Sequence, residues 1–126
     1  MPYYASLKAG NPDDKRTAEG LLRLMQALDL KVPAKSFDRK LLIATWNIRE
    51  FGAQKYGPRL DESLRYIAEI INRFDLVAIQ EVRENLTEFN KVLNLLGGWW
   101  KPLFTDVTEG NQGNSERAAF LRLAQT

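Results

Sequence analysis

Residues 41–48 read LLIATWNI, and residues 75–82 read DLVAIQEV. Both are apolar runs of strand length, and each reaches a polar side chain where the run ends. Residues 60–74, between them, carry apolar side chains at helical spacing, which predicts a helix. A β-helix-β unit of this length places its strands parallel with a right-handed crossover, so their carboxyl ends meet at one edge of the sheet. We therefore expect Asn47 and Glu81 to be neighbours there.

The chemistry of this pair favours a metal site. Amide and carboxylate oxygens suit Mg²⁺, which keeps several waters and takes one or two carboxylates. Taken alone, Asn47 is more typical of a turn, and an isolated Glu81 is more typical of a solvated strand end. Those interpretations do not explain why a carboxamide and a carboxylate end two adjacent parallel strands, so the joint pattern favours the metal.

The residues before these strands predict a helix on the outside of the main domain. Asp13 or Asp14 can cap a helix that follows Pro12, and Pro33 ends the run. Apolar side chains along this segment fall on one face, which is typical of a helix that covers a core. We expect residues 1–40 to form an N-terminal helical extension.

The residues after the second strand continue the alternation of helices and strands. Asn85 and Glu88 stand at capping-box spacing, and the helix that they begin is expected to end at the glycine pair 97–98. Residues 99–107 and 116–124 are expected to be strands joined by a polar loop. All three tryptophans are expected in the core: Trp46, Trp99 and Trp100.

Composition limits the classes of protein that this chain can represent. Its 126 residues are 44% hydrophobic and 27% charged, which fits one ordinary domain with a real core. The net charge of +2 is too small to indicate nucleic-acid binding by itself. The absence of cysteine excludes disulfides, a thiolate nucleophile and zinc-thiolate sites. No stretch suits a signal peptide or a membrane span, so we expect a soluble, cytoplasmic protein.

Three blocks of sequence together resemble the endonuclease/exonuclease/phosphatase superfamily, whose fold is that of deoxyribonuclease I. They are TWNIREFG at 45–52, DLVAIQEVRENL at 75–86 and GNSERAAFL at 113–121, in the order and spacing of the family. The resemblance covers residues 41–126 and implies an incomplete, N-terminal portion of the domain. It implies an α+β fold, the first half of a four-layer αββα sandwich in which a mixed β-sheet is flanked by helices.

The resemblance also implies hydrolysis of a phosphodiester or phosphomonoester that depends on Mg²⁺ or Mn²⁺. Glu81 matches the direct metal ligand of the family, and Asn47 matches the residue that binds a metal-bound water or the phosphate. Glu116 matches the acid that orients the general-acid histidine. These three residues are the expected catalytic group, and Asn47 and Glu81 are the expected metal site.

Three further positions are expected to bind nucleic acid or phosphate. Arg49 and Arg83 match residues that contact the nucleic-acid backbone or minor groove in the nuclease branch of the family. Asn114 stands where some of these nucleases carry a DNA-contacting tyrosine, two residues before Glu116. The implied partner is nucleic acid or another phosphoester substrate.

The proton-transfer half of such a site is missing, because the chain contains no histidine. The later His, Asp-x-Asn and Asp-His elements of the family have no counterpart before Thr126. We therefore expect the N-terminal half of the catalytic domain of a nuclease, with the remainder of that domain as a partner that covers a face of the sheet. The 126 residues alone are expected to be inactive. The alternatives are an inactive binding domain that keeps half of the fold, and a phosphatase or phospholipid phosphodiesterase of the same superfamily.

Overall fold

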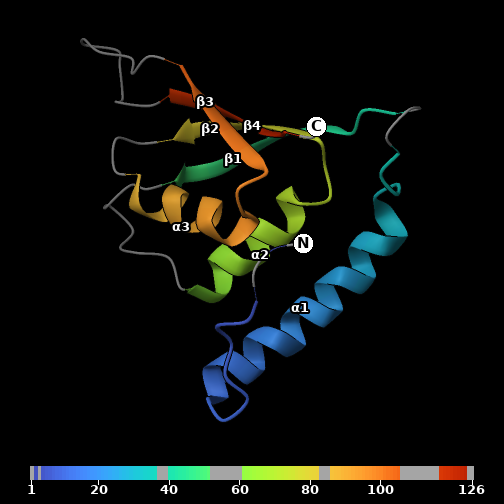
Figure 1. Cartoon of the computed structure of the whole chain (residues 1–126), viewed down its shortest axis with the longest axis vertical. Helices are drawn as coiled ribbons and strands as arrows, with labels where there is room; N and C mark the ends of the chain where they lie inside the picture. The colour runs from blue at the N-terminus through green and yellow to red at the C-terminus, as the bar shows by residue number, and fades with distance from the viewer. Residues whose placement is uncertain are drawn as a thin grey trace.

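The computed structural model describes residues 2, 4–36, 40–51, 61–82, 86–105 and 117–124 of the chain, without the side chains of residues 49–51 and 81. Within these ranges three helices and four strands alternate (Figure 1). The helices are α1 (Pro12–Lys31), α2 (Asp61–Ile71) and α3 (Thr87–Leu96). The strands are β1 (Ile43–Phe51), β2 (Leu76–Val82), β3 (Trp100–Phe104) and β4 (Arg117–Leu123).

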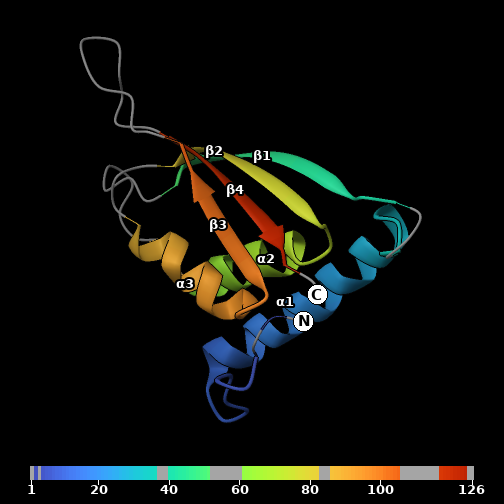
Figure 2. The same ribbon diagram turned by 45° about the horizontal axis from the view of Figure 1, so that its top comes forward.

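The four strands form one mixed sheet in the order β1-β2-β4-β3. β1 and β2 are parallel, as the helix between them requires, while β4 runs antiparallel to both β2 and β3. Helices α2 and α3 pack on one face of this sheet (Figure 2). The expected α+β class, with a mixed sheet layered against helices, is thus confirmed and agrees with part of a deoxyribonuclease I-like fold.

The core lies between the sheet and the two helices. Alternate residues of each strand point toward the helices, so Ile79 of β2 and Ala119 of β4, which are register partners, are both fully buried. Phe89 of α3 stacks at a tilt against Phe104 of β3, with ring centroids 5.1 Å apart. The other large, fully buried side chains come from the same elements: Leu64, Ile71, Val77, Val82, Val92 and Leu121.

The opposite face of the sheet is open in the part of the chain that is described (Figure 2). One row across it joins Thr45, Ala78, Phe120 and Leu103 through successive register pairs. Leu103 is 69% exposed, and Ile43, near the start of β1, is 57% exposed. Large apolar side chains on a sheet face are typical of a surface that another layer covers.

Helix α1 lies outside the sheet and packs on α2 (Figure 1). Leu21 and Thr17 are its buried residues, so part of one face of α1 packs inward. The expected cap was wrong: Asn11, and not Asp13 or Asp14, accepts hydrogen bonds from the backbone at positions 13 and 14. Asn11 occupies the N-cap with an extended backbone, so its side-chain oxygen reaches these two amides, and Pro12 stands at the start of the helix, where no amide proton is needed. The division of the chain at residue 40 stays a prediction.

The ends of α3 and the tryptophans test two further expectations. Leu86 precedes α3 and makes no side-chain capping hydrogen bond. Asn85 lies outside the described residues, so the expected capping box with Glu88 stays a prediction. Gly97 ends the helix as predicted, with a φ of 95° that favours glycine. Trp100 is in the core at 3% exposure, whereas Trp99 is 62% exposed and was wrongly assigned there. Trp99 directly precedes β3, and the side chain that begins this strand, Trp100, faces the helices.

No helix in the described part of the chain combines the length and apolarity needed to cross a bilayer.

Candidate functional site

The carboxyl ends of β1 and β2 lie side by side, which is where the sequence predicts a site. The parallel register pairs Trp46 with Ile79 and then Asn47 with Gln80. Ile48 and Ile79 are buried against the helices, so alternation places Asn47 on the open face. Asn47 and Gln80 are both exposed to solvent. Two carboxamides therefore stand together at this edge, one on each strand.

Glu81 follows Gln80 in β2, at the point where the register changes. The β1–β2 pairing shifts between Asn47 and Phe51, and the β2–β4 pairing shifts between Ile79 and Val82. Ile79 and Val82 are both fully buried although they are three positions apart, so the alternation of faces breaks between them. Such bulges are frequent beside active sites, because an extra residue re-aims a side chain and ends the pairing. The backbone of Glu81 belongs to this irregularity, and its side chain lies outside the described residues.

The donor chemistry at this edge suits a hard cation. Asn47 and Gln80 offer amide oxygens, which Mg²⁺ and Mn²⁺ accept as ligands, and Glu81 would add a carboxylate from the same strand end. With no histidine or cysteine in the chain, the imidazole and thiolate ligands of softer metals are absent. Within the described side chains, no three His, Cys, Asp or Glu residues gather at one point. The assignment of Asn47 and Glu81 as metal ligands stays a prediction.

The remaining predicted site residues are described only in part. Arg49 lies in β1, two residues beyond Asn47, with its side chain outside the description. Arg83, Asn114 and Glu116 all lie outside the described residues. In the sequence Glu116 directly precedes Arg117, the first residue of β4, and Arg117 pairs in register with Val82. The roles expected of these four residues therefore stay predictions.

Arg117 is a residue at this edge to which the sequence assigned no role. Its guanidinium carbon lies 5.6 Å from the centre of the Phe104 ring, a cation–π arrangement. Its Nε is buried and has no hydrogen-bond partner among the described residues. A guanidinium held in this way keeps donor capacity for an oxygen acceptor near the end of β2 and the beginning of β4. Nothing in the local sequence indicates this, because Phe104 belongs to a different strand.

A second group of ionisable side chains lies between α1 and α2 and is structural. Glu69 is buried, accepts a short hydrogen bond from the Tyr4 hydroxyl, and lies 3.0 Å from Arg73 Nε. Burial, reinforced by Glu69, raises the pKa of Tyr4 well above its ordinary value. Arg73 also pairs with Asp29 of α1, which raises the pKa of Arg73. These contacts fasten α1 and the N-terminal residues to the domain.

Comparison with known proteins finds a matching family and relatives that share part of this sequence. The model of the Endonuclease/Exonuclease/phosphatase family matches residues 44–122, which run from β1 into β4 and make up more than half of the chain. Deoxyribonuclease-1 of Equus caballus is 46% identical over 57 residues, which are 44% of this chain and 20% of that protein. Deoxyribonuclease-1 of Sus scrofa is 40% identical over 75 residues, which are 59% of this chain and 26% of that protein. The chain thus matches about a quarter or less of the length of these relatives.

Proposed function

Because the chain belongs to the endonuclease/exonuclease/phosphatase family, as its three sequence blocks predicted, we propose that it is the N-terminal part of a nuclease that depends on a divalent metal. The proposed reaction is hydrolysis of phosphodiester bonds in nucleic acid. Two relatives, which match 57 and 75 residues of this chain, are deoxyribonucleases by name, and this supports nucleic acid as the substrate class over other phosphoesters.

The register of β1 and β2 is the observation that most directly supports the proposal. It sets Asn47 opposite Gln80 and one position from Glu81, with a bulge that interrupts both neighbouring ladders. An Asn and a Glu from separate parallel strands can then share one Mg²⁺ or Mn²⁺ ion, with waters completing the shell. A bound divalent cation would neutralise charge on the phosphate oxygens.

The chain's own residues then have distinct roles in the proposal. Glu81 holds the cation, and Asn47 hydrogen-bonds a water or a phosphate oxygen beside it. Arg49 and Arg83 contact the nucleic-acid backbone or minor groove, since a guanidinium forms bidentate hydrogen bonds with phosphate. Asn114 lies at a position of substrate contact, and Glu116 orients a general acid that the remainder of the domain supplies.

In this proposal the general acid comes from the remainder of the domain, so the 126 residues alone are proposed to be inactive. Phosphoester hydrolysis needs a group that exchanges protons near neutral pH, and a positioned general acid or base contributes about 10²–10⁴ in rate. Histidine is the side chain whose ordinary pKa suits this task, and the chain has none. The proposed partner is the remainder of the catalytic domain, packed on the open face of the sheet.

Metal binding tests the proposal without requiring activity. We expect Mn²⁺, which is paramagnetic, to broaden the amide NMR signals of Asn47 and Gln80 before those of α1. Glu81→Ala should abolish this selective broadening, and Asn47→Ala should weaken it. Glu19→Ala, which removes an exposed carboxylate of α1, serves as the matched control and should leave it unchanged. Equal broadening in Glu81→Ala and in the unmodified chain would refute the metal assignment.

A further inference from the structure

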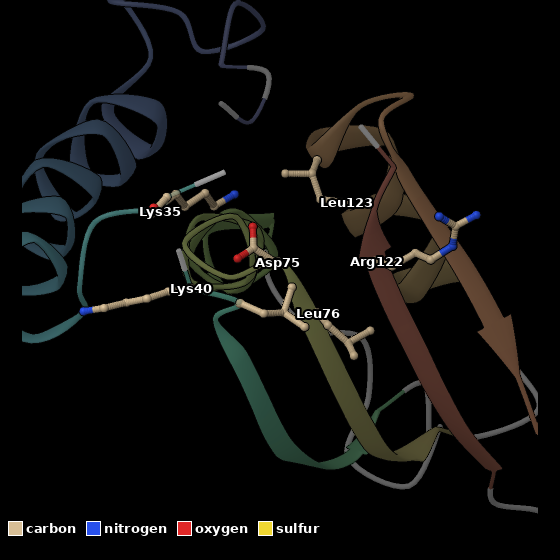
Figure 3. A pocket seen from close by; sticks show the side chains of 8 residues that line it. Lys35, Lys40, Asp75, Leu76, Arg122 and Leu123 are labelled. Atoms are coloured by element: carbon tan, nitrogen blue, oxygen red, sulfur yellow. The ribbon is translucent and has the colours of Figure 1, made fainter. Parts of the chain in front are cut away.

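A pocket of about 370 Å³ lies at the other end of the sheet from Asn47 and Glu81 (Figure 3). It is bounded by the beginnings of β1 and β2, the end of β4, and the segment that leads from α1 into β1. Since β2 has seven residues at roughly 3.3 Å each, about 20 Å separates the two ends of the strand. The pocket is therefore distinct from the proposed metal site. Its lining consists of Lys35, Ser36, Lys40, Leu41, Asp75, Leu76, Arg122 and Leu123.

The walls of this pocket rest on a well-connected backbone. Leu42 accepts a hydrogen bond from the Asp75 amide at 2.8 Å, and its own amide donates to the Asp75 carboxylate at 2.9 Å. The Leu123 amide donates to the Asp75 carbonyl at 2.9 Å. Three strand ends are thus joined around Asp75. A pocket with walls of this kind needs little rearrangement to accept a ligand.

Lys35 brings a positive charge into the pocket without a full set of partners. Figure 3 shows its ammonium end directed toward the interior, on the side of Asp75 and Leu123. Its Nζ lies 5.6 Å from the centre of the Trp100 ring. Lys35 is exposed as a whole residue, but partial burial of its ammonium lowers its pKa, against the attraction of the Asp75 carboxylate. Among the described residues none forms an ion pair or hydrogen bond with this ammonium, although an ammonium has three donors.

Among the described residues that line the pocket, positive charges exceed negative ones. Lys35, Lys40 and Arg122 outnumber Asp75, one of whose carboxylate oxygens already accepts the Leu42 amide. Lys40 and Arg122 are exposed and carry their charged ends outward on opposite sides of the opening (Figure 3). They raise the local concentration of anions and can turn toward one that enters. The leucines offer an apolar surface beside the charges.

We propose that this pocket binds the phosphate group of a small phosphorylated molecule, with Lys35 as the central contact. Lysine is a common phosphate ligand because its compact ammonium serves as a point charge with three donors. A phosphate oxygen at Lys35 completes the hydrogen bonding of the ammonium, and the organic part of the ligand lies against Leu41, Leu76 and Leu123. The proposal is independent of the nuclease assignment, since it requires no metal.

The test is an NMR titration of the 126-residue chain with EDTA present, so that the proposed metal site contributes nothing. The probes are thymidine 5′-monophosphate, inorganic phosphate, thymidine, and an oligothymidylate without terminal phosphates. We expect the monophosphate to shift the amides of Leu42, Leu76 and Leu123 and to leave that of Asn47 in place. Inorganic phosphate should bind more weakly, and thymidine and the oligonucleotide should not shift these amides.

Three variants of the chain test whether Lys35 is the central contact of the bound phosphate. Lys35→Gln should weaken monophosphate binding about tenfold, the loss expected for one charge-assisted hydrogen bond. Asp75→Asn keeps an oxygen for the Leu42 amide but removes a negative charge, so binding should tighten. Lys15→Gln, an exposed lysine of α1, is the matched control and should change nothing.

Several outcomes would overturn the proposal. They are an unchanged affinity in Lys35→Gln while its NMR spectrum remains that of the folded chain, shifts confined to other regions, or no binding at millimolar monophosphate. If thymidine bound as tightly as the monophosphate, the pocket would recognise only the organic part of the ligand and not its phosphate. If the oligonucleotide bound as tightly as the monophosphate, the pocket would be a site for a nucleic-acid backbone. If inorganic phosphate bound as tightly as the monophosphate, the ligand of the pocket would be the free phosphate ion.

Discussion

Substitution of Gly20 by alanine distinguishes a docked α1 from a loosely attached helix. Gly20 lies in the middle of α1, where alanine is ordinarily more stable than glycine by about 1 kcal/mol. In this fold a Cβ at position 20 would overlap the Tyr66 hydroxyl oxygen and would lie 2.7 Å from Tyr66 Cζ. The three nearest atoms all belong to the hydroxyl end of the Tyr66 side chain, which must therefore move to admit a methyl group.

The net effect follows from two opposing terms. Overpacking costs about 1–3 kcal/mol, because Tyr66 must turn away from α1 and from the Glu62 carboxylate to which its hydroxyl donates at 2.6 Å. The gain in helix propensity offsets about 1 kcal/mol of this cost. We expect Gly20→Ala to lower the free energy of unfolding by up to about 2 kcal/mol, against the sign that propensity alone predicts.

The same substitution should change sign when Tyr66 is absent. A Tyr66→Ala background removes the three atoms nearest to the added methyl group, so Gly20→Ala should raise the free energy of unfolding by about 1 kcal/mol. Urea unfolding followed by circular dichroism measures all four proteins of this double-mutant cycle. If Gly20→Ala raises the midpoint equally in both backgrounds, α1 does not pack on Tyr66 and the reasoning is refuted.

Three further predictions concern the sheet, the N-terminus and the activity. The open face with Leu103 and Ile43 should make the 126-residue chain self-associate, and Leu103→Lys should shift sedimentation toward the monomer; a monodisperse unmodified chain that binds no hydrophobic dye would contradict this. The pKa of Tyr4 is raised in the folded state, so the neutral hydroxyl of Tyr4 contributes fully to stability at a pH below the ordinary tyrosine pKa of about 10. This contribution is lost progressively as the pH rises above that ordinary value. The stability difference between the unmodified chain and Tyr4→Phe should therefore shrink in alkaline urea titrations, and a constant difference would refute the Tyr4–Glu69 bond. The chain alone should not hydrolyse DNA or an aryl phosphodiester even with Mn²⁺, and cleavage that falls in Glu81→Ala would show that a carboxylate acts as the base.

The local pattern predicted most of the fold because each element carries its own periodicity. The two apolar runs became β1 and β2, and the helical spacing between them became α2, so their parallel pairing followed from the connection. The exact ends of the helices were harder to predict from the sequence. At the start of α1, Asn11 is the capping residue in place of Asp13 or Asp14. Asn, Asp and Ser are nearly equivalent caps, and only backbone geometry selects among neighbours.

For the candidate site too, the sequence indicated the features that depend on contiguous residues and missed those that depend on how the strands pair. The sequence indicated Asn47 and Glu81, because their residue types stand at the ends of two predicted strands. It did not indicate Gln80 as the partner of Asn47, or Arg117 over Phe104, since both depend on strand register. Register is set by the length of the crossover helix and by how the buried side chains interlock, and neither has a local signature.

The sequence by itself determined the class of fold, the parallel pairing of β1 and β2 and the family, because apolar periodicity and three motifs are properties of contiguous residues. Only the tertiary structure decided where the alternation breaks, which face of the sheet stays open and what surrounds Lys35. Asp75 in the lining of the pocket and Trp100 under the Lys35 ammonium come from distant parts of the chain, and the pairing of β2, β4 and β3 brings them near Lys35. Contacts of this kind arise from packing between elements, since a side chain's neighbours across a sheet are set by register and not by its place along the chain.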